Sequence, residues 1–352
     1  MKRWIYVFCV LAAGIVPRGA GGETADKALA AGFRAHCMRI YKASPDSLAV
    51  RGEDGWLFLR KELRHIAVGT FWGDRAIEVS RSTKPDQADP LEAIVEYNKQ
   101  CRDNNIELIV LPIPPKAMIY PEAIAGEVIP AGFAANPVRL DAAHQQFYRL
   151  LQDRGVTVLD PTDVFLERRA GGSERMYCRQ DSHFSGKACI VLGKVLAERV
   201  RAAPWCAKVP KQHISAGTET IEIDGDLREA FEDDKVPRET VTVRKVKHDG
   251  LPIMDDPDSP VLLMGDSHTL VFHAGGDMHA RASGLADQLA CELKFGVDVI
   301  GVRGSGARTA RVSLYRRARN GNYLAGKKLI IWCFAARDLT ESSGWGVVPL
   351  KP

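Results

Sequence analysis

Five short apolar runs, preceded or separated by helical stretches, constrain the fold of this chain more than any other feature. They are rich in Val, Ile and Leu on both faces, as strands buried inside a parallel sheet are. The runs cover residues 106–111, 156–159, 261–264, 297–302 and 329–334. Helical patterns cover residues 89–103, 136–155, 186–201, 284–294 and 308–319. Strands that alternate with helices predict a three-layer α/β fold with a mainly parallel sheet.

Residues 207–248 interrupt this alternation. Within them, residues 218–223 and 239–246 alternate polar and apolar side chains, as exposed antiparallel strands do. The sequence therefore predicts a small β-rich insertion at this point. Two shorter runs around an Asp-Gly turn predict a hairpin over residues 48–59. A helix over residues 25–41 and a long polar connection over residues 64–89 are also predicted.

The first residues follow the pattern of a secretory signal. Two basic residues precede an apolar run over residues 4–16, and small residues follow at 20–22. The run is shorter than the roughly 18 apolar residues that a membrane span requires, which favours cleavage. The alternative is an uncleaved signal that anchors the chain in the inner membrane. We predict a signal over residues 1–22 and a single exported domain over residues 23–352.

Charge and cysteine content exclude some partners and cofactors. The net charge of +4 is too small to indicate a nucleic-acid partner, but it suits an acidic polysaccharide. The cysteines show no CxxC spacing and no Cys/His pattern, so no metal is predicted. In an oxidising compartment one or two disulfides are expected, with Cys37, Cys178 and Cys206 as candidates because they lie in loops or at segment ends. Cys101 and Cys333 fall inside apolar patterns, where a free, packed thiol is expected.

The strongest chemical candidate is Ser267, in the tripeptide Gly265-Asp266-Ser267 that follows the strand predicted over residues 261–264. Ligands bind at the carboxyl edge of open α/β sheets. A serine on a tight turn at that edge holds its hydroxyl clear of the sheet, as a nucleophile requires. The alternative is an ordinary turn in which Asp266 and Ser267 bond nearby backbone groups.

Asp181 and His183 could supply an orienting carboxylate and a base. In an extended segment, residues two apart point to the same side. The Asp181 carboxylate could therefore bind one ring nitrogen of His183 and leave the other for Ser267. The alternative is a helix cap formed by Asp181 or Ser185, with His183 exposed. Together with Ser267, the pair predicts Ser-His-Asp catalysis.

Other predicted strand ends carry candidates for oxyanion and substrate binding. The N–H of Ser267 and the glycines Gly304 and Gly306 could stabilise an oxyanion, with an ordinary loop as the alternative for the glycines. Cationic and polar side chains at the same edge could bind uronate carboxylates, although a solvated surface charge is the alternative for each. His268 could line the pocket or simply pack. These substrate-binding candidates are Lys116, Tyr120, His268, Arg303, Arg308 and Arg337.

Several motifs taken together resemble the SGNH hydrolase-like proteins of alginate O-acetylation, the AlgJ and AlgX family. They are the Gly-Trp hairpin over residues 52–59, the Pro-rich turn over residues 112–121, Asp181-Ser182-His183, Gly265-Asp266-Ser267 and residues 332–338. The likeness covers roughly residues 50–340. It implies an SGNH-like, flavodoxin-like fold with a circularly permuted order of motifs. It also implies Ser267 as nucleophile, His183 as base and Asp181 as orienter, without a cofactor.

By this resemblance, Ser267 would take an acetyl group and pass it to a hydroxyl of an exported polysaccharide, alginate or a similar uronate polymer, in the periplasm. The partners implied are that acidic polysaccharide, a membrane-bound O-acyltransferase that delivers the acetyl donor, and a polysaccharide secretion complex. Phe184 stands where the family often has Trp. The chain ends at Pro352 without the carbohydrate-binding module of AlgX, so an AlgJ-like layout is expected. The alternatives are an SGNH-type carbohydrate acetylesterase and a non-catalytic scaffold or sugar-binding subunit.

Overall fold

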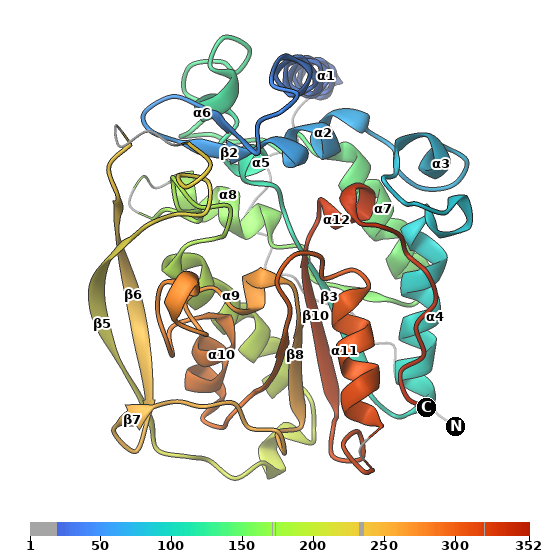
Figure 1. The fold of residues 1–352 in the computed structure, drawn as a ribbon, viewed down its shortest axis with the longest axis vertical. Coiled ribbons are helices and arrows are strands. Elements are labelled where there is room, and N and C mark those ends of the chain that lie inside the picture. Colours follow the sequence, from blue (N-terminus) through green and yellow to red (C-terminus); the bar gives the residue numbers. More distant parts are fainter. Residues whose placement is uncertain (1–19, 171, 173, 232–235, 320) are drawn as a thin grey trace.

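A five-stranded parallel sheet lies at the centre of the molecule (Figure 1). The computed structural model describes residues 20–352, apart from residues 171, 173, 232–235 and 320. The strands lie in the order β4-β3-β10-β8-β9. They are β3 (Glu107–Ile113), β4 (Thr157–Val158), β8 (Val261–Gly265), β9 (Asp298–Gly301) and β10 (Leu329–Ala335). Each coincides with one of the five predicted runs, so the predicted α/β sheet is confirmed.

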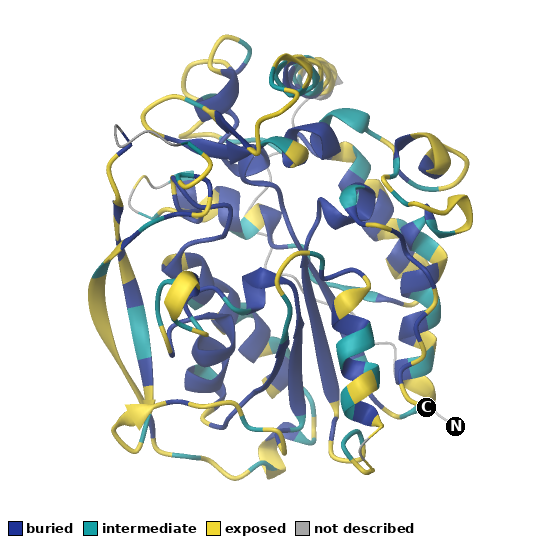
Figure 2. Ribbon diagram, viewed as in Figure 1, coloured by how far each residue is buried: buried dark blue, intermediate teal, exposed yellow. Residues whose placement is uncertain are grey.

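Helices cover both faces of this sheet and complete three layers. On one face, Leu263 and Ile331 belong to the apolar core shared with α8, α9 and α10. On the other face, Leu262 and Trp332 belong to the core shared with α4, α7 and α11. Because successive strand residues point to opposite faces, both sets must be apolar, and Figure 2 shows the central strands buried. These helices are α4 (Pro90–Asp103), α7 (Ala142–Asp153), α8 (Thr162–Ala170), α9 (Gly186–Arg201), α10 (Leu285–Leu293) and α11 (Thr309–Ala318).

The helix predicted over residues 136–155 begins later than expected, at Ala142. Pro137 disfavours helical backbone at the residue before it. Arg139 then binds Asp141 and Asp160 through ion pairs whose nitrogen–oxygen distances are both 2.6 Å. These ion pairs hold the segment in a non-helical path up to the start of α7.

The prediction of an irregular polar connection over residues 64–89 is also corrected, because about half of these residues are helical. Leu63 and Ile66 lie three residues apart on one helix face, and both are buried in the main core. Their burial packs one face of this short helix against the domain. The elements in this region are α2 (Arg60–Val68), α3 (Arg75–Val79) and the short 3₁₀ helix η1 (Pro85–Gln87).

The first described helix is α1 (Ala20–Ala43), which extends the helix predicted over residues 25–41 at both ends. The predicted signal over residues 1–22 falls mainly on residues 1–19, which lie outside the described residues. Within the part of the chain that the structure describes, no helix combines the length and the apolarity needed to cross a bilayer.

The predicted β-rich insertion forms an antiparallel sheet of its own, with β5 (Ile214–Ile223), β6 (Glu239–His248) and β7 (Leu251–Pro252). Val243 and Val246 of β6 are buried in the core that α9 and α10 share, so this sheet covers those two helices (Figure 1). The predicted hairpin pairs β1 (Ala49–Arg51) with β2 (Leu57–Leu59). The remaining short elements are α5 (Lys116–Ile119), α6 (Glu122–Ala125), η2 (Cys206–Lys208), η3 (Ser267–Thr269), η4 (Gly276–Met278) and α12 (Asp338–Glu341).

All cysteines in the described residues are free and buried. The disulfides predicted for Cys37, Cys178 and Cys206 are therefore corrected. Each of these side chains packs in the main apolar core instead of lying at a loop surface. Burial raises the pKa of the Cys178 thiol well above its ordinary value. Cys101 and Cys333 are packed free thiols, as predicted.

We predict that Gly265→Ala disrupts the pairing of β8 with β10. A Cβ atom at Gly265 would lie 1.6 Å from the carbonyl oxygen of Cys333, so one strand would have to move. The free energy of unfolding should fall by more than about 4 kcal/mol, measured by denaturant titration. Gly217→Ala on β5 is the matched control, because a Cβ atom there meets nothing within 4 Å. Equal unfolding midpoints for the two variants would contradict the prediction.

Candidate active site

Ser267 follows the last residue of β8 by two positions and opens the short helix η3. The turn is fixed by Asp266, whose carboxylate accepts hydrogen bonds from the N–H of His268 at 2.9 Å and from the N–H of Ala335 at 2.7 Å. Ala335 ends the neighbouring strand β10. The sheet therefore holds Ser267 at its carboxyl edge, where 8% of the residue remains exposed.

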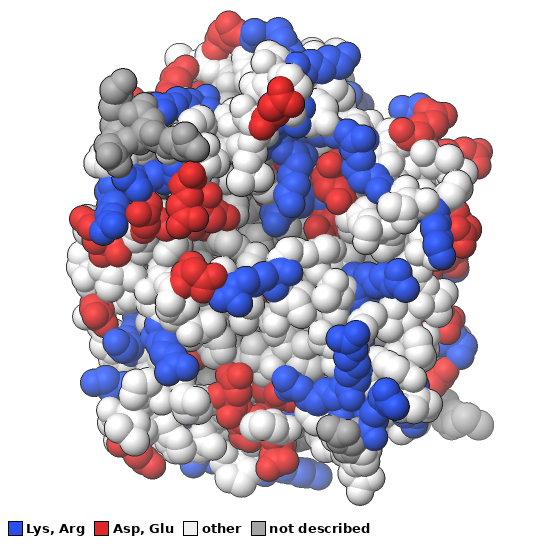
Figure 3. Space-filling view, viewed as in Figure 1, with Lys and Arg blue, Asp and Glu red and all other residues white. Residues whose placement is uncertain are grey.

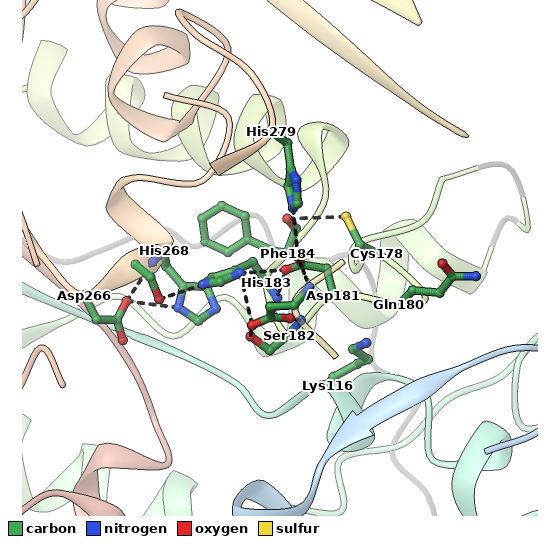
Figure 4. Close-up of polar contacts among 12 residues, drawn as sticks. Lys116, Cys178, Gln180, Asp181, Ser182, His183, Phe184, Asp266, His268 and His279 are labelled. Carbon is green, nitrogen blue, oxygen red and sulfur yellow. Dashed lines mark hydrogen bonds and ion pairs between the residues drawn. The ribbon is translucent and has the colours of Figure 1, made fainter. Parts of the chain in front are cut away.

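His183 reaches Ser267 from the loop that precedes α9. Its Nε2 lies 2.6 Å from Ser267 Oγ. Its Nδ1 lies 2.6 Å from Asp181 Oδ1 (Figure 4). Ser185 caps α9, accepting from the N–H of Ala188 at 3.2 Å, but His183 is buried instead of exposed. Ser267, His183 and Asp181 are thus in hydrogen-bond contact in the order that the sequence predicts.

Asp181 holds two partners on each of its carboxylate oxygens. Oδ1 accepts from the backbone N–H of His183 at 2.9 Å as well as from its ring. Oδ2 accepts from the N–H of Asp226 at 3.0 Å and binds His279 Nε2 at 2.8 Å. A carboxylate with this many donors cannot rotate without breaking hydrogen bonds, so the ring of His183 is held in one orientation.

Opposite charges shift the protonation of this pair. Burial raises the pKa of Asp181, but the combined effect of His183 and His279 outweighs burial and holds that pKa well below its usual range. Burial lowers the pKa of His183, yet Asp181, with smaller help from Asp226 and Asp266, outweighs burial and raises it above the ordinary value. The arrangement can therefore stabilise a protonated His183, the state that follows proton transfer from a serine.

The tripeptide Asp-Ser-His occurs twice at this site, at residues 181–183 and 266–268. In both copies the Asp Oδ1 binds the backbone N–H and the ring Nδ1 of the His two residues later. The two imidazole rings meet edge to face, with centroids 5.0 Å apart. The serines differ, because Ser267 contacts His183 whereas Ser182 Oγ donates to Asp226 Oδ2 at 2.5 Å.

One potential metal-ligand atom from each of Asp181, His183 and Asp226 lies within 4.8 Å of the other two, close enough to hold a metal ion. Each residue is already engaged in hydrogen bonds. His183 Nδ1 binds Asp181, and both carboxylate oxygens of Asp226 accept from Ser182. The cluster therefore functions as a hydrogen-bond network.

The predicted oxyanion candidates differ in whether their N–H groups already donate a hydrogen bond within the fold. The N–H of Gly306 donates to Asp338 Oδ2 at 2.8 Å, so this prediction is corrected. A Cβ atom at Gly306 would lie 2.8 Å from the nitrogen of Asp266, so glycine is needed there for close packing. Gly304 is exposed, with φ of 94°. Within the described residues, the N–H of Ser267 donates no hydrogen bond.

Three predicted substrate-binding side chains are instead buried and engaged in the fold. Lys116 Nζ donates to the carbonyl oxygens of Leu57 at 2.6 Å and Arg179 at 3.1 Å. The Tyr120 hydroxyl accepts from the N–H of Met176 at 2.9 Å. Arg337 Nη1 donates to Glu62 Oε1 at 2.8 Å. The prediction that Lys116, Tyr120 and Arg337 contact a polymer is therefore corrected, because burial leaves them no surface for it.

The other three candidates lie nearer to solvent or to the site. Arg303 is exposed and binds Asp277 through two hydrogen bonds of 2.6 and 2.9 Å. Arg308 is exposed just before α11. His268 is buried between the rings of His183 and Phe184. Figure 3 shows basic side chains interspersed with acidic ones on the face drawn there.

Sequence reasoning missed three residues that hold the site together, namely Glu62, Asp226 and His279. Each belongs to an element far from Asp181 or Arg337 in the chain. No spacing rule connects them to these partners, so only the folded structure reveals their roles.

The family model described as SGNH hydrolase-like domain, acetyltransferase AlgX, matches residues 49–336. This range includes Asp181, His183 and Ser267 and most of the chain. The chain belongs to this family. The predicted AlgJ- and AlgX-like resemblance is thereby confirmed.

Individual relatives agree with this family. The chain is 25% identical over 189 residues to a probable alginate O-acetylase AlgJ of Pseudomonas fluorescens, covering 50% of this chain and 46% of that protein. It is 26% identical over 152 residues to the corresponding protein of Azotobacter vinelandii, covering 43% and 33%. The match thus spans less than half the length of either relative.

Two solved structures share the fold. The O-acetyltransferase domain of Pseudomonas putida AlgJ has a TM-score of 0.61 at 19% identity, covering 84% of this chain and 92% of that one. Pseudomonas aeruginosa AlgX has a TM-score of 0.54 at 16% identity, covering 84% and 66%. These likenesses confirm the SGNH-like architecture.

We predict that an aryl sulfonyl fluoride modifies Ser267, at a rate that rises with pH. His183 must be neutral to accept the serine proton, and its pKa is raised. The rate should therefore fall as pH drops through a midpoint above the ordinary histidine value of about 6.5. Intact mass gives the rate, and peptide mapping gives the site. Modification of Ser182 instead, or a rate independent of pH, would contradict this.

Proposed function

We propose that this protein is an O-acetyltransferase that carries an acetyl group on Ser267 and transfers it to hydroxyls of an acidic polysaccharide, alginate or a similar uronate polymer. The observation that carries the proposal is the continuous contact from Ser267 Oγ through His183 to Asp181, with both links at 2.6 Å. Membership of a family described by its acetyltransferase supports the acetyl group as the cargo. Relatives named as alginate O-acetylases support the acceptor.

In the first half-reaction, Ser267 Oγ attacks the carbonyl carbon of the acetyl donor while His183 Nε2 accepts the serine proton. Asp181 stabilises the resulting imidazolium. The tetrahedral intermediate then expels the donor's leaving group, which takes the proton from His183. The products are acetyl-Ser267 and the deacetylated donor.

In the second half-reaction, a sugar hydroxyl attacks the acetyl carbon of acetyl-Ser267. His183 takes the proton of that hydroxyl and returns it to Ser267 Oγ as the carbon–oxygen bond to serine breaks. The products are the acetylated sugar and the free serine. Side chains supply every proton transfer, so the proposal requires no cofactor.

The negative charge of each tetrahedral intermediate requires hydrogen-bond donors. The free N–H of Ser267 is suited to this role because it belongs to the residue that carries the acetyl group. The N–H of Gly304, an exposed residue, is a second candidate. Gly306 is excluded because its N–H is already bound to Asp338.

The proposed setting is the periplasm, which the signal pattern over residues 1–22 and the alginate-modifying relatives support. Cleavage would give an exported single domain over residues 23–352, whereas an uncleaved signal would anchor it. In that setting, a membrane-bound O-acyltransferase would supply the acetyl donor. A polysaccharide secretion complex would present the acceptor polymer.

We predict that Ser267→Ala abolishes acetyl transfer, because no other serine hydroxyl among the described residues contacts His183. The protein is incubated with a small acetyl ester and uronate oligosaccharides, and mass spectrometry follows the gain of one acetyl group on the sugar. Ser215→Ala, at an exposed position on β5, is the control and should transfer normally.

The same experiment separates the competing functions. Free acetate without acetylated sugar, across uronate and neutral acceptors, would favour the acetylesterase. Absence of both products in the wild-type protein would favour a non-catalytic scaffold or sugar-binding subunit. Normal transfer by Ser267→Ala would overturn the assignment of the nucleophile.

We further predict that Arg308→Ala raises the KM for uronate oligosaccharides about two- to fivefold, the size expected of an exposed charge pair. Arg308 is exposed at the loop that leads from the carboxyl end of β9. The KM for neutral acceptors should not change, and added salt should reduce the difference. Arg316→Ala, exposed near the other end of α11, is the matched control. An equal effect on neutral acceptors would contradict a charge-based role.

A further inference from the structure

We propose that His279 is a positioning residue of this site, which donates from Nε2 to Asp181 and thereby sets both the orientation and the proton affinity of His183. The inference deepens the proposed acetyl transfer and rests on it. It adds a second imidazole to Asp181, so that the contact runs from His279 through Asp181 and His183 to Ser267.

The direction of the hydrogen bond follows from the acceptor. An ionised carboxylate can only accept, so the 2.8 Å contact requires a hydrogen on His279 Nε2. Asp181 Oδ1 faces the ring of His183, while Oδ2 faces the ring of His279 (Figure 4). One carboxylate therefore bridges two imidazoles, each bound to a different oxygen. Both rings are shielded from solvent, with 6% and 7% of their side chains exposed.

The backbone at His279 is unusual for a residue with a side chain. Its φ of 71° and ψ of −58° are those of a γ-turn, a rare and strained conformation outside glycine. The N–H of Ala280 donates to the carbonyl oxygen of Met278 at 2.9 Å and closes that turn. Glycine would adopt this conformation without strain. A histidine is therefore informative here, because its side chain supplies a contact that glycine could not.

The surrounding loop holds this conformation in place. The N–H of Phe272 donates to Met278 at 2.8 Å, and the N–H of Gly275 donates to Ala280 at 2.8 Å. The ring of Phe272 packs against the ring of His279, with centroids 5.6 Å apart. The imidazole is thus fixed before substrate binds, as a positioning role requires.

The charges around His279 come from several elements. Asp181 contacts it from the loop before α9, and the backbone N–H of Asp226 from the insertion binds the same carboxylate oxygen. Asp277 lies two residues before His279 and is bound by Arg303 at the surface. Asp266 and His268 lie next to His183, and the buried cation of Lys116 interacts with Asp181.

The expected effect on His183 has a definite sign. The hydrogen bond from His279 partly offsets the negative charge of Asp181. Without that bond, Asp181 attracts the proton of His183 more strongly, which favours the imidazolium. The proton affinity of His183 should rise, and the acid limb of activity should move to higher pH. Loss of one hydrogen bond to a charged group should lower kcat about 10- to 100-fold, with KM for the ester unchanged.

The test compares His279→Gly, whose glycine suits the left-handed backbone, with His279→Gln, whose amide can still donate. Ala282→Gly is the matched control, because Ala282 lies in the same loop with φ of 56°. Each change is also made on a Ser267→Ala background with isotope-labelled histidine. NMR titration then gives the midpoint of His183, assigned by the signal lost in His183→Gln.

We expect His279→Gly to raise the proton affinity of His183 three- to tenfold and to lower kcat. His279→Gln should restore most of both quantities, and Ala282→Gly should alter neither. An unchanged His183 midpoint in His279→Gly, or equal losses in the Gly and Gln variants, would overturn the inference. Wild-type protein without acetyl transfer would defeat the proposed function, whereas the NMR titration would still test the link from His279 to His183.

Discussion

The geometry of the site depends on the hydrogen bonds that the buried carboxylate of Asp266 accepts. It is fully buried at the end of β8, yet it accepts hydrogen bonds from Ala335 on β10 and from the backbone and ring of His268. Burial alone would raise its pKa, but His268 and these bonds outweigh burial and keep the pKa below the usual range. Because Asp266 is satisfied by a neighbouring strand, the pairing of β8 with β10 fixes the position of Ser267.

Asp181 plays the matching part in the facing loop, but it depends on a different region of the chain. The insertion reaches this loop at two points, through the N–H of Asp226 and through Glu239 at the start of β6, which accepts from the N–H groups of Arg179 and Gln180. The antiparallel sheet is therefore more than a cover for α9 and α10. It supports the carboxylate that orients His183, so the site is stable only when the central sheet and the insertion are both folded.

The sequence was sufficient to predict features formed by residues close together in the chain. It was insufficient to predict contacts between residues far apart in the chain. Apolar runs predicted the five strands of the central sheet, because burial on both faces favours apolar side chains at successive positions. Two-residue spacing predicted that Asp181 and His183 would meet. By contrast, Lys116 was predicted to bind substrate at the carboxyl edge of the sheet, but its ammonium group donates hydrogen bonds to two carbonyl oxygens of the fold. The sequence pattern could not reveal that Lys116 is buried. It also could not predict the contact between His279 and Asp181, which lie 98 residues apart in the chain.

The two Asp-Ser-His tripeptides show why surroundings, and not the motif, decide which serine can react. Both histidines are buried and both bind the preceding aspartate, but their pKa values move in opposite directions. Burial lowers the pKa of both rings. At His183 the carboxylates of Asp181, Asp226 and Asp266 outweigh burial. At His268 the carboxylate of Asp266 offsets burial only in part, and the nearby charges of His183 and Arg337 add to the lowering. His183 is therefore the better proton acceptor, and it faces the serine of the other tripeptide. His268 is favoured as a neutral ring that packs against it.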